Sequence, residues 1–110
     1  MIKEEKAGWR SDLERKERLL MEAYGFQYER DFRSGYVKIN LDNLHFHVRF
    51  NILEGPHDTA ASATKPTLVL VHGYMCSGVS SFVQWFRLLV PHYRVVVFDN
   101  CGWGLNTRLT

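Results

Sequence analysis

Several features that would assign these 110 residues to a protein class at once are missing. The charged stretch 1–20 contains no apolar core, which argues against a secretory signal or a membrane span there. Lysine and arginine exceed aspartate and glutamate by only 14 to 12, too little and too evenly spread to indicate a nucleic-acid partner. We therefore expect a cytoplasmic protein that has no transmembrane segment and binds no nucleic acid.

Cysteine and recognisable ligand motifs are also scarce. Cys76 and Cys101 form no disulfide framework and match no zinc spacing, so we expect both to be reduced. His45 and His47 stand two residues apart, but no third ligand has suitable spacing, and we interpret them as exposed strand histidines. Stretch 102–107 lacks the third glycine of a dinucleotide fingerprint, and no phosphate-binding loop motif occurs. We expect no metal and no cofactor.

With 45% hydrophobic and 24% charged residues, the chain has the composition of one soluble globular domain. Ser11 and Glu14 have the S-x-x-E spacing of a helix start, and Gly25 offers a stop. The segment between them is amphipathic, and we expect its apolar stripe to pack on the protein body, because mixed charges argue against a membrane-surface helix. The predicted stripe is Trp9, Leu13, Leu20, Ala23 and Tyr24, with Arg15, Glu17, Arg18 and Glu22 largely elsewhere.

Residues 36–52 alternate between apolar and polar side chains, which predicts a β-hairpin whose tight turn is Asp42-Asn43. We expect one face of the hairpin to be core and the other to be solvated. Stretch 54–65 is small, polar and turn-rich, and we interpret it as a surface loop. The predicted core row is Val37, Ile39, Leu41, Leu44, Phe46, Val48, Phe50 and Ile52.

Two later segments, 67–71 and 93–98, are continuously apolar, as strands are when helices cover both faces of a parallel sheet. Between them, residues 79–90 repeat apolar side chains at helical spacing, and we expect Ser80 and Ser81 to cap that helix, with Gln84 as a partner. Strand, helix and strand predict a right-handed crossover between parallel strands. The expected class is α/β: helix, antiparallel hairpin, then a β-α-β unit.

Both apolar strands end in polar, glycine-containing segments. His72-Gly73-Tyr74 follows the first strand, and Asp99 follows the second. Ligands of open parallel sheets bind beyond the carboxyl ends of strands, where a glycine lets the backbone turn and a following N–H can face an oxyanion. Histidine and glycine also end buried strands for structural reasons, so this motif alone is weak.

The combination of a strand ending in HG, a helix, a second strand and D-x-x-G-x-G resembles the α/β-hydrolase fold family, from about Val37 to Arg108. The hairpin is similar to that family's first two strands, and the nearest branch is that of acylglycerol and lysophospholipid lipases and lipase co-activators. The resemblance implies that 1–110 is a partial hydrolase domain, with 1–35 a helical extension and 36–110 the start of the sheet. Asn106 stands where relatives often have serine.

The resemblance also implies roles for individual residues. The backbone N–H of Tyr74 would be an oxyanion-hole donor, with that of Met75 as the alternative, against the rival view that this loop merely closes the strand. Neither His72 nor Asp99 would belong to the catalytic triad, since the family order is nucleophile, acid, then histidine. The residues that would shape the loops are His72, Gly73, Asp99, Gly102 and Gly104.

The remaining chemistry of such an enzyme is missing from this sequence. No G-x-S-x-G occurs, and the nearest string, 78–82, lacks the second glycine and a preceding strand. We expect no nucleophile, triad acid or general base in this chain, and we interpret Cys101 as a packing residue rather than a thiol nucleophile.

Two functional hypotheses follow. One is a hydrolase of acyl esters, in particular lipid esters, of which this chain carries the oxyanion side while being inactive alone. The other is a non-catalytic truncated lobe that binds a lipid or a protein. Peripheral contact with a membrane or lipid droplet remains open under both. The strand 67–71 would lack a neighbour on its far side, and we expect self-association.

Overall fold

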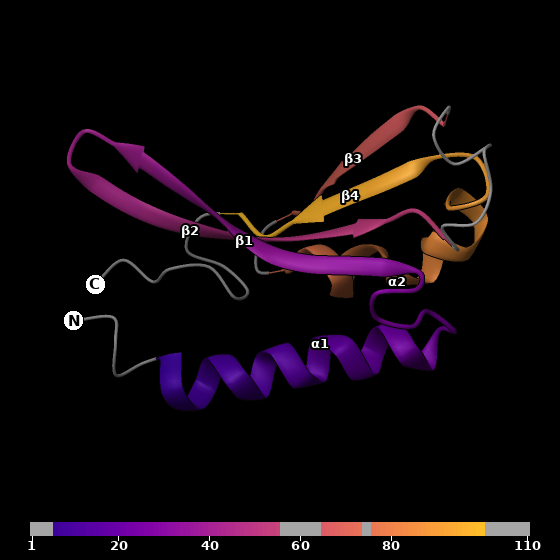
Figure 1. Cartoon of the computed structure of the whole chain (residues 1–110), viewed down its shortest axis with the longest axis horizontal. Helices are drawn as coiled ribbons and strands as arrows, with labels where there is room; N and C mark the ends of the chain where they lie inside the picture. The colour runs from indigo at the N-terminus through magenta and orange to yellow at the C-terminus, as the bar shows by residue number, and fades with distance from the viewer. Residues whose placement is uncertain (1–5, 56–64, 74–75, 101–110) are drawn as a thin grey trace.

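A computed structural model describes residues 6–55, 65–73 and 76–100. Four strands form one sheet in the order β1-β2-β4-β3, in which β2 is antiparallel to β1 and β4, and β3 is parallel to β4 (Figure 1). The α/β class, the N-terminal helix, the antiparallel hairpin and the parallel strand pair are therefore confirmed. The elements are η1 (Lys6–Arg10), α1 (Ser11–Ala23), β1 (Phe32–Leu41), β2 (Leu44–Leu53), β3 (Thr67–Val71), α2 (Gly78–Leu89) and β4 (Arg94–Phe98).

The first residue and the end of α1 were predicted correctly, but the cap predicted at its start was not. Gly25 has a φ of 94°, and the N–H groups of Gly25 and Phe26 donate to the carbonyls of Glu22 and Met21, which closes the helix. At the other end, the π-helical turn η1 leads directly into α1, so Arg10 holds the cap position with helical backbone and no side-chain cap bond. Because the preceding residues already form a helical turn, Ser11 caps nothing.

The inward face of α1 also differs from the predicted stripe. Met21 is its fully buried residue, whereas Ala23 and Tyr24 are exposed. Glu17, which we placed largely off the inward face, is mostly buried and bonds to Arg49 of β2. Contacts with the sheet thus include an ion pair in the middle of the helix and apolar packing near its end.

The hairpin is longer than predicted, running from Phe32 to Leu53. Asp42 and Asn43 have φ values of 45° and 67° and form the predicted two-residue turn, which pairs Leu41 with Leu44. This part of the sequence prediction is confirmed.

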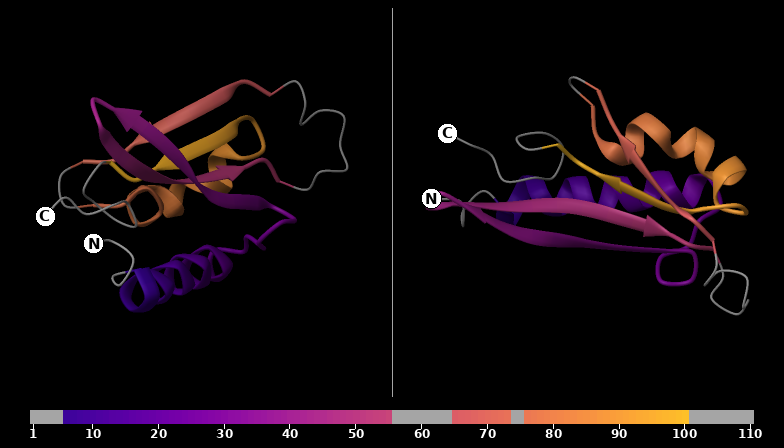
Figure 2. Two further views of the ribbon diagram at one scale, coloured as in Figure 1. Left: turned by 60° about the vertical axis from the view of Figure 1, so that its left-hand side comes forward. Right: turned by 90° about the horizontal axis from the view of Figure 1, so that it is seen from above.

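The predicted core face of the hairpin was wrong. Both α1 and α2 lie on one side of the sheet (Figures 1 and 2), and the hairpin residues turned toward them include Phe32, Arg49, Asn51 and Leu53. The continuously apolar row lies on the opposite side, which no described helix covers. We call this side the helix-free face: Val37, Ile39, Leu41, Leu44, Phe46, Val48, Phe50 and Ile52, continued by Val69, Val71, Val96 and Phe98.

The core lies between the other face of the sheet and the two helices. Ten buried apolar side chains from α1, α2, three strands and the connections after α1 and α2 form it, and Phe26 and Phe86 meet edge to face with centroids 6.1 Å apart. No helix in the described segments is long and apolar enough to cross a bilayer. The buried set is Met21, Phe26, Phe32, Leu53, Val79, Val83, Phe86, Val90, Val95 and Val97.

The unit β3-α2-β4 begins with a strand of the predicted bounds, 67–71, which lies at the edge of the described sheet. Helix α2 begins one residue earlier than expected and is capped by Ser77, whose hydroxyl accepts from the N–H of Ser80 while the Ser80 side chain accepts from the N–H of Ser77. The predicted cap at Ser80 and Ser81, with Gln84 as partner, was wrong because the helix starts before both serines.

Candidate functional site

Because β3 and β4 are parallel, their carboxyl ends bring His72 and Asn100 to the same edge of the sheet. The backbone N–H of Asn100 donates to His72 Nε2 at 2.7 Å, and Asn100 Nδ2 donates to the His72 carbonyl at 3.1 Å. Since Nε2 accepts, Nδ1 carries the ring proton and donates to the Gly73 carbonyl at 2.7 Å. Both nitrogens of the buried ring therefore bind backbone, and the ring joins the two strand ends.

Asp99 connects the end of β4 to two other elements. Its side-chain oxygen Oδ1 accepts from the N–H of Gly78 at 2.7 Å, and its own N–H donates to the Arg49 carbonyl at 3.0 Å. The residue is 2% exposed. A carboxylate at the first N–H of α2 also interacts favourably with the positive end of the helix dipole.

Two glycines near this edge have different surroundings. At Gly78, a Cβ would lie 2.9 Å from the Phe98 carbonyl oxygen and 3.2 Å from the Phe98 backbone N and C. At Gly73, where we expected a glycine to let the backbone turn, no described atom lies within 4 Å of a Cβ and φ is not positive. The close backbone approach therefore occurs at Gly78, where α2 meets β4.

Several predicted site residues fall outside the described segments: Tyr74, Met75, Gly102 and Gly104, together with Cys101 and Asn106. The structure brings His72, Gly73 and Asp99 to one edge of the sheet, as the strand ends predicted, and Cys76 is exposed. Sequence reasoning missed Asn100, although its place directly after Asp99 at a strand end was a usable signal.

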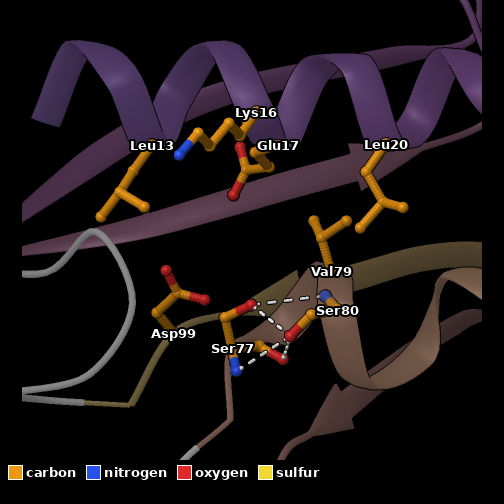
Figure 3. A pocket seen from close by; sticks show the side chains of 8 residues that line it. All are labelled: Leu13, Lys16, Glu17, Leu20, Ser77, Val79, Ser80 and Asp99. Carbon is orange, nitrogen blue, oxygen red and sulfur yellow. Dashed lines mark hydrogen bonds between the residues drawn. The ribbon is translucent and has the colours of Figure 1, made fainter.

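A cleft of about 210 Å³ opens between α1 and the start of α2, next to Asp99. Figure 3 shows Leu13, Glu17 and Leu20 of α1 directed toward the start of α2 and Asp99. Apolar groups and two carboxylates share the lining, so the cleft suits a small ligand with apolar and polar parts. Its lining is Leu13, Lys16, Glu17, Leu20, Ser77, Val79, Ser80 and Asp99.

Glu17, which lines this cleft, also belongs to an ion-pair network that the sequence patterns did not reveal. Arg49 Nη2 lies 2.8 Å from Glu17 Oε1, and Arg49 Nη1 lies 3.7 Å from Glu14 Oε2. The Asn51 side chain accepts from the Ser34 hydroxyl and hydrogen-bonds to Glu17. A usable signal was the polar row of β2, in which Arg49 and Asn51 follow His45 and His47 at every second position.

Burial raises the pKa of Glu17 above its usual 4.5, and the nearby Asp99 carboxylate adds to this rise. The Arg49 charge and hydrogen bonds act in the opposite direction without overcoming burial. For Arg49, burial is the largest single influence and lowers the pKa, but Glu17, Tyr36 and Glu14 together outweigh it and raise the pKa of the guanidinium. Folding therefore disfavours the charged form of Glu17 and favours the charged form of Arg49.

We expect Glu17 to make stability fall as the pH rises. A group whose pKa is raised by folding stabilises the fold below its unfolded pKa, and this stabilisation is lost as the pH rises through the folded pKa. In urea titrations between about pH 4 and about pH 7, the unfolding free energy of the wild type minus that of Glu17→Gln should decrease with pH. A difference that is constant, or that grows with pH, would contradict this assignment.

Within the described segments, the geometry supports positioning and binding but provides no complete catalytic group. The hydroxyls of Ser77 and Ser80 bond to each other at 2.7 Å, and the His72 ring is engaged by backbone. No three histidine, cysteine, aspartate or glutamate side chains of the described part could hold a metal ion together. His45 instead bonds to Asn40 across the hairpin.

Comparisons with known proteins give one similarity in fold. No family model matches the sequence, and no curated protein matches it. Among solved structures, the crystal structure of a membrane phospholipase A, described as a novel bacterial virulence factor, is similar with a TM-score of 0.52 and 20% identity. The similarity covers 94% of this chain and 26% of that one, so this chain spans about a quarter of the length of that protein. At this level of identity, the chain shares the fold of part of that phospholipase.

Proposed function

We propose that this chain forms the carbonyl-binding part of an acyl-ester hydrolase of the α/β-hydrolase type, acting on lipid esters such as acylglycerols or lysophospholipids. In this proposal the N–H of Tyr74, or that of Met75, donates to the oxyanion that forms on the ester carbonyl. The similar fold of a phospholipase supports the lipid-ester class. Nucleophile and general base would come from polypeptide other than these 110 residues.

The observation that carries the proposal is the hydrogen bond from His72 Nδ1 to the Gly73 carbonyl. In a planar trans peptide the carbonyl and the following N–H point in opposite directions, so in this proposal the bond to the Gly73 carbonyl would also orient the next N–H. Asn100 holds the ring from its other nitrogen. His72 would then be a positioning residue for the oxyanion donor and would not touch the substrate.

The transcript provides the direct test of the proposal. A reading frame that continues past Thr110 into a strand followed by G-x-S-x-G supports it, and the longer product should hydrolyse monoacylglycerol or lysophospholipid emulsions. In that product, His72→Ala should lower kcat with little change in KM, because the oxyanion donor acts in the transition state. A stop codon after Thr110 would overturn the hydrolase proposal and favour the lipid- or protein-binding lobe.

The 110-residue chain alone should not hydrolyse p-nitrophenyl butyrate measurably above background. A positioned nucleophile and base supply most of the rate of such enzymes, and an oxyanion loop without them leaves at most ~10³ over water. The measurement is p-nitrophenolate release by purified protein, with Ser77→Ala, Ser80→Ala and Ser81→Ala as controls. Turnover that survives these three changes and disappears with Cys101→Ala would instead assign a thiol nucleophile.

A further inference from the structure

The cleft between α1 and the start of α2 has no role in the oxyanion chemistry proposed above. It measures about 210 Å³ and lies on the side of the sheet that the helices cover. Described residues of both helices, together with Asp99 after β4, form its lining. The cleft is therefore a space between packed elements, unlike the helix-free face, which no described helix covers.

The polar side chains deep in the lining have partners within the protein. The hydroxyls of Ser77 and Ser80 bond to each other at 2.7 Å, and Asp99 Oδ1 accepts from the N–H at the start of α2 at 2.7 Å. Glu17 pairs with Arg49 at 2.8 Å. These lining groups need no partner from a ligand, so the polar part of a ligand can remain at the mouth of the cleft.

Apolar side chains provide the remaining contact surface. Leu13 and Leu20 of α1 are half-buried, and Val79 of α2 is 1% exposed. In Figure 3, Leu20 points toward Val79 across the cleft. Lys16 is exposed, so its ammonium group can stay in water at the rim. The interior of the cleft therefore suits a hydrocarbon chain, which gains from removal of apolar area from water.

The cleft lies at the edge of the sheet where the ester carbonyl of the proposed substrate would bind. Asp99 lines the cleft and directly follows β4 at the edge where His72 follows β3. Ser77, another lining residue, is three positions after Tyr74 in the sequence, a stretch that spans at most about 11 Å. A lipid ester held by its carbonyl at this edge therefore has the cleft within reach of its acyl chain.

We propose that this cleft binds the acyl chain of the lipid ester, an inference that rests on the proposed function, and that Leu13, Leu20 and Val79 determine which chain lengths fit. Its volume is below the roughly 300–1,000 Å³ of pockets that enclose drug-sized ligands, so it takes a short stretch of chain rather than a whole lipid. Each methylene group that it buries should strengthen binding about fourfold until the cleft is full.

Binding is tested with 1-O-alkylglycerols, ether analogues of monoacylglycerols that contain no ester bond to cleave. In calorimetric titrations of the 110-residue chain below the critical micelle concentrations, affinity should rise from the butyl to the hexyl to the octyl compound. Leu20→Trp, which fills the cleft, should weaken binding of the octyl compound at least about tenfold. Leu13→Trp is a second variant should the first misfold, and circular dichroism checks the fold of each.

Leu19→Trp is the matched control for these variants. Leu19 neighbours Leu20 on α1 but is 50% exposed and does not line the cleft, so octyl binding should not change. The proposal is overturned if the wild type does not bind the octyl compound or if Leu19→Trp weakens binding as much as Leu20→Trp. Unchanged octyl binding in both Leu20→Trp and Leu13→Trp also overturns it.

Hydrolysis by the longer product separates this inference from the proposed function. Leu20→Trp should lower the ratio of kcat/KM for p-nitrophenyl octanoate to that for p-nitrophenyl acetate at least about tenfold, and Leu19→Trp should leave the ratio unchanged. Hydrolysis with the same ratio in the wild type and Leu20→Trp would overturn the acyl-chain cleft while the proposed function stands. Absence of hydrolysis, with alkylglycerol binding that rises with chain length, would overturn the proposed function and support the cleft. Binding by the 110-residue chain that the longer product lacks would show that further polypeptide fills the cleft, which also overturns this inference.

Discussion

Replacing Arg49 with leucine should lower the free energy of unfolding by about 3–5 kcal/mol, because it leaves the Glu17 carboxylate buried without its partner. Arg49 is 7% exposed, and the Glu17 side chain is 10% exposed. The change also removes the contact of the guanidinium over the Tyr36 ring, 5.0 Å from its centroid. Urea denaturation at neutral pH measures the loss. The cost should diminish in acid, where Glu17 takes up a proton.

Two variants separate this pair from ordinary surface charge. Arg33→Leu is the matched control, since Arg33 pairs with Glu54 on the same hairpin but its side chain is 57% exposed, and its loss should cost less than about 1 kcal/mol. The double variant Glu17→Leu/Arg49→Leu should be more stable than Arg49→Leu alone, since no buried charge remains. Equal costs for Arg49→Leu and Arg33→Leu would show that burial of the Glu17–Arg49 pair has no energetic consequence.

Local sequence signals correctly predicted the turn and the helix end. Asp42-Asn43 and Gly25 adopt positive φ, and both were recognised from residue type alone. Helix starts were less predictable: Ser11 has the right spacing to Glu14, but a helical turn already precedes it. At α2, three serines are possible caps, and tertiary contacts of Gly78 with β4 determine that Ser77 is the one used.

The covered face of the sheet could not be predicted from alternation. A period of two shows which residues share a face, but the position of the helices determines which face becomes core. Here the polar row with Arg49 and Asn51 faces the helices, because α1 supplies Glu17 as a partner. Hydrophobicity alone favoured the other row.

Exposure on α2 was predicted only in part. With no further neighbours beside helix 79–90, the sequence predicts partial exposure of Phe82, Trp85 and Phe86. Trp85 is 51% exposed and Phe82 is partly buried against the core, but Phe86 is completely buried because Phe26, from the segment after α1, packs against its ring. No local pattern indicated that this segment would reach α2.

The candidate site shows the same division between local and distant information. Two apolar strands, each followed by polar residues, were enough to bring His72 and Asp99 to one edge, because parallel strands end together. Their hydrogen-bond partners were not predictable, since His72 to Asn100 and Asp99 to Gly78 join residues 28 and 21 positions apart. The first bond depends on the pairing of β3 with β4, and the second on how α2 packs on β4.

Replacing Gly78 with alanine should lower the free energy of unfolding by about 1–3 kcal/mol, although alanine normally favours helices. The added methyl group would lie 2.9 Å from the Phe98 carbonyl oxygen, and all three nearest atoms belong to the β4 backbone, which cannot rotate away as a side chain could. Moving α2 outward to relieve this contact would stretch the 2.7 Å bond from Gly78 N–H to Asp99 and leave a buried carboxylate poorly satisfied. Thermal and urea unfolding measure the loss.

Gly73→Ala is the matched control for this change, because Gly73 lies at the same edge of the sheet, five residues earlier. Its φ is not positive, and no described atom lies within 4 Å of the position its Cβ would take, so the unfolding free energy should change by less than about 0.5 kcal/mol. The comparison therefore isolates close packing from the general effect of replacing a glycine. If both variants lose the same stability, the contact between α2 and the β4 backbone is not what fixes the start of the helix, and the alternative is that both glycines matter for the conformation of the loop between β3 and α2.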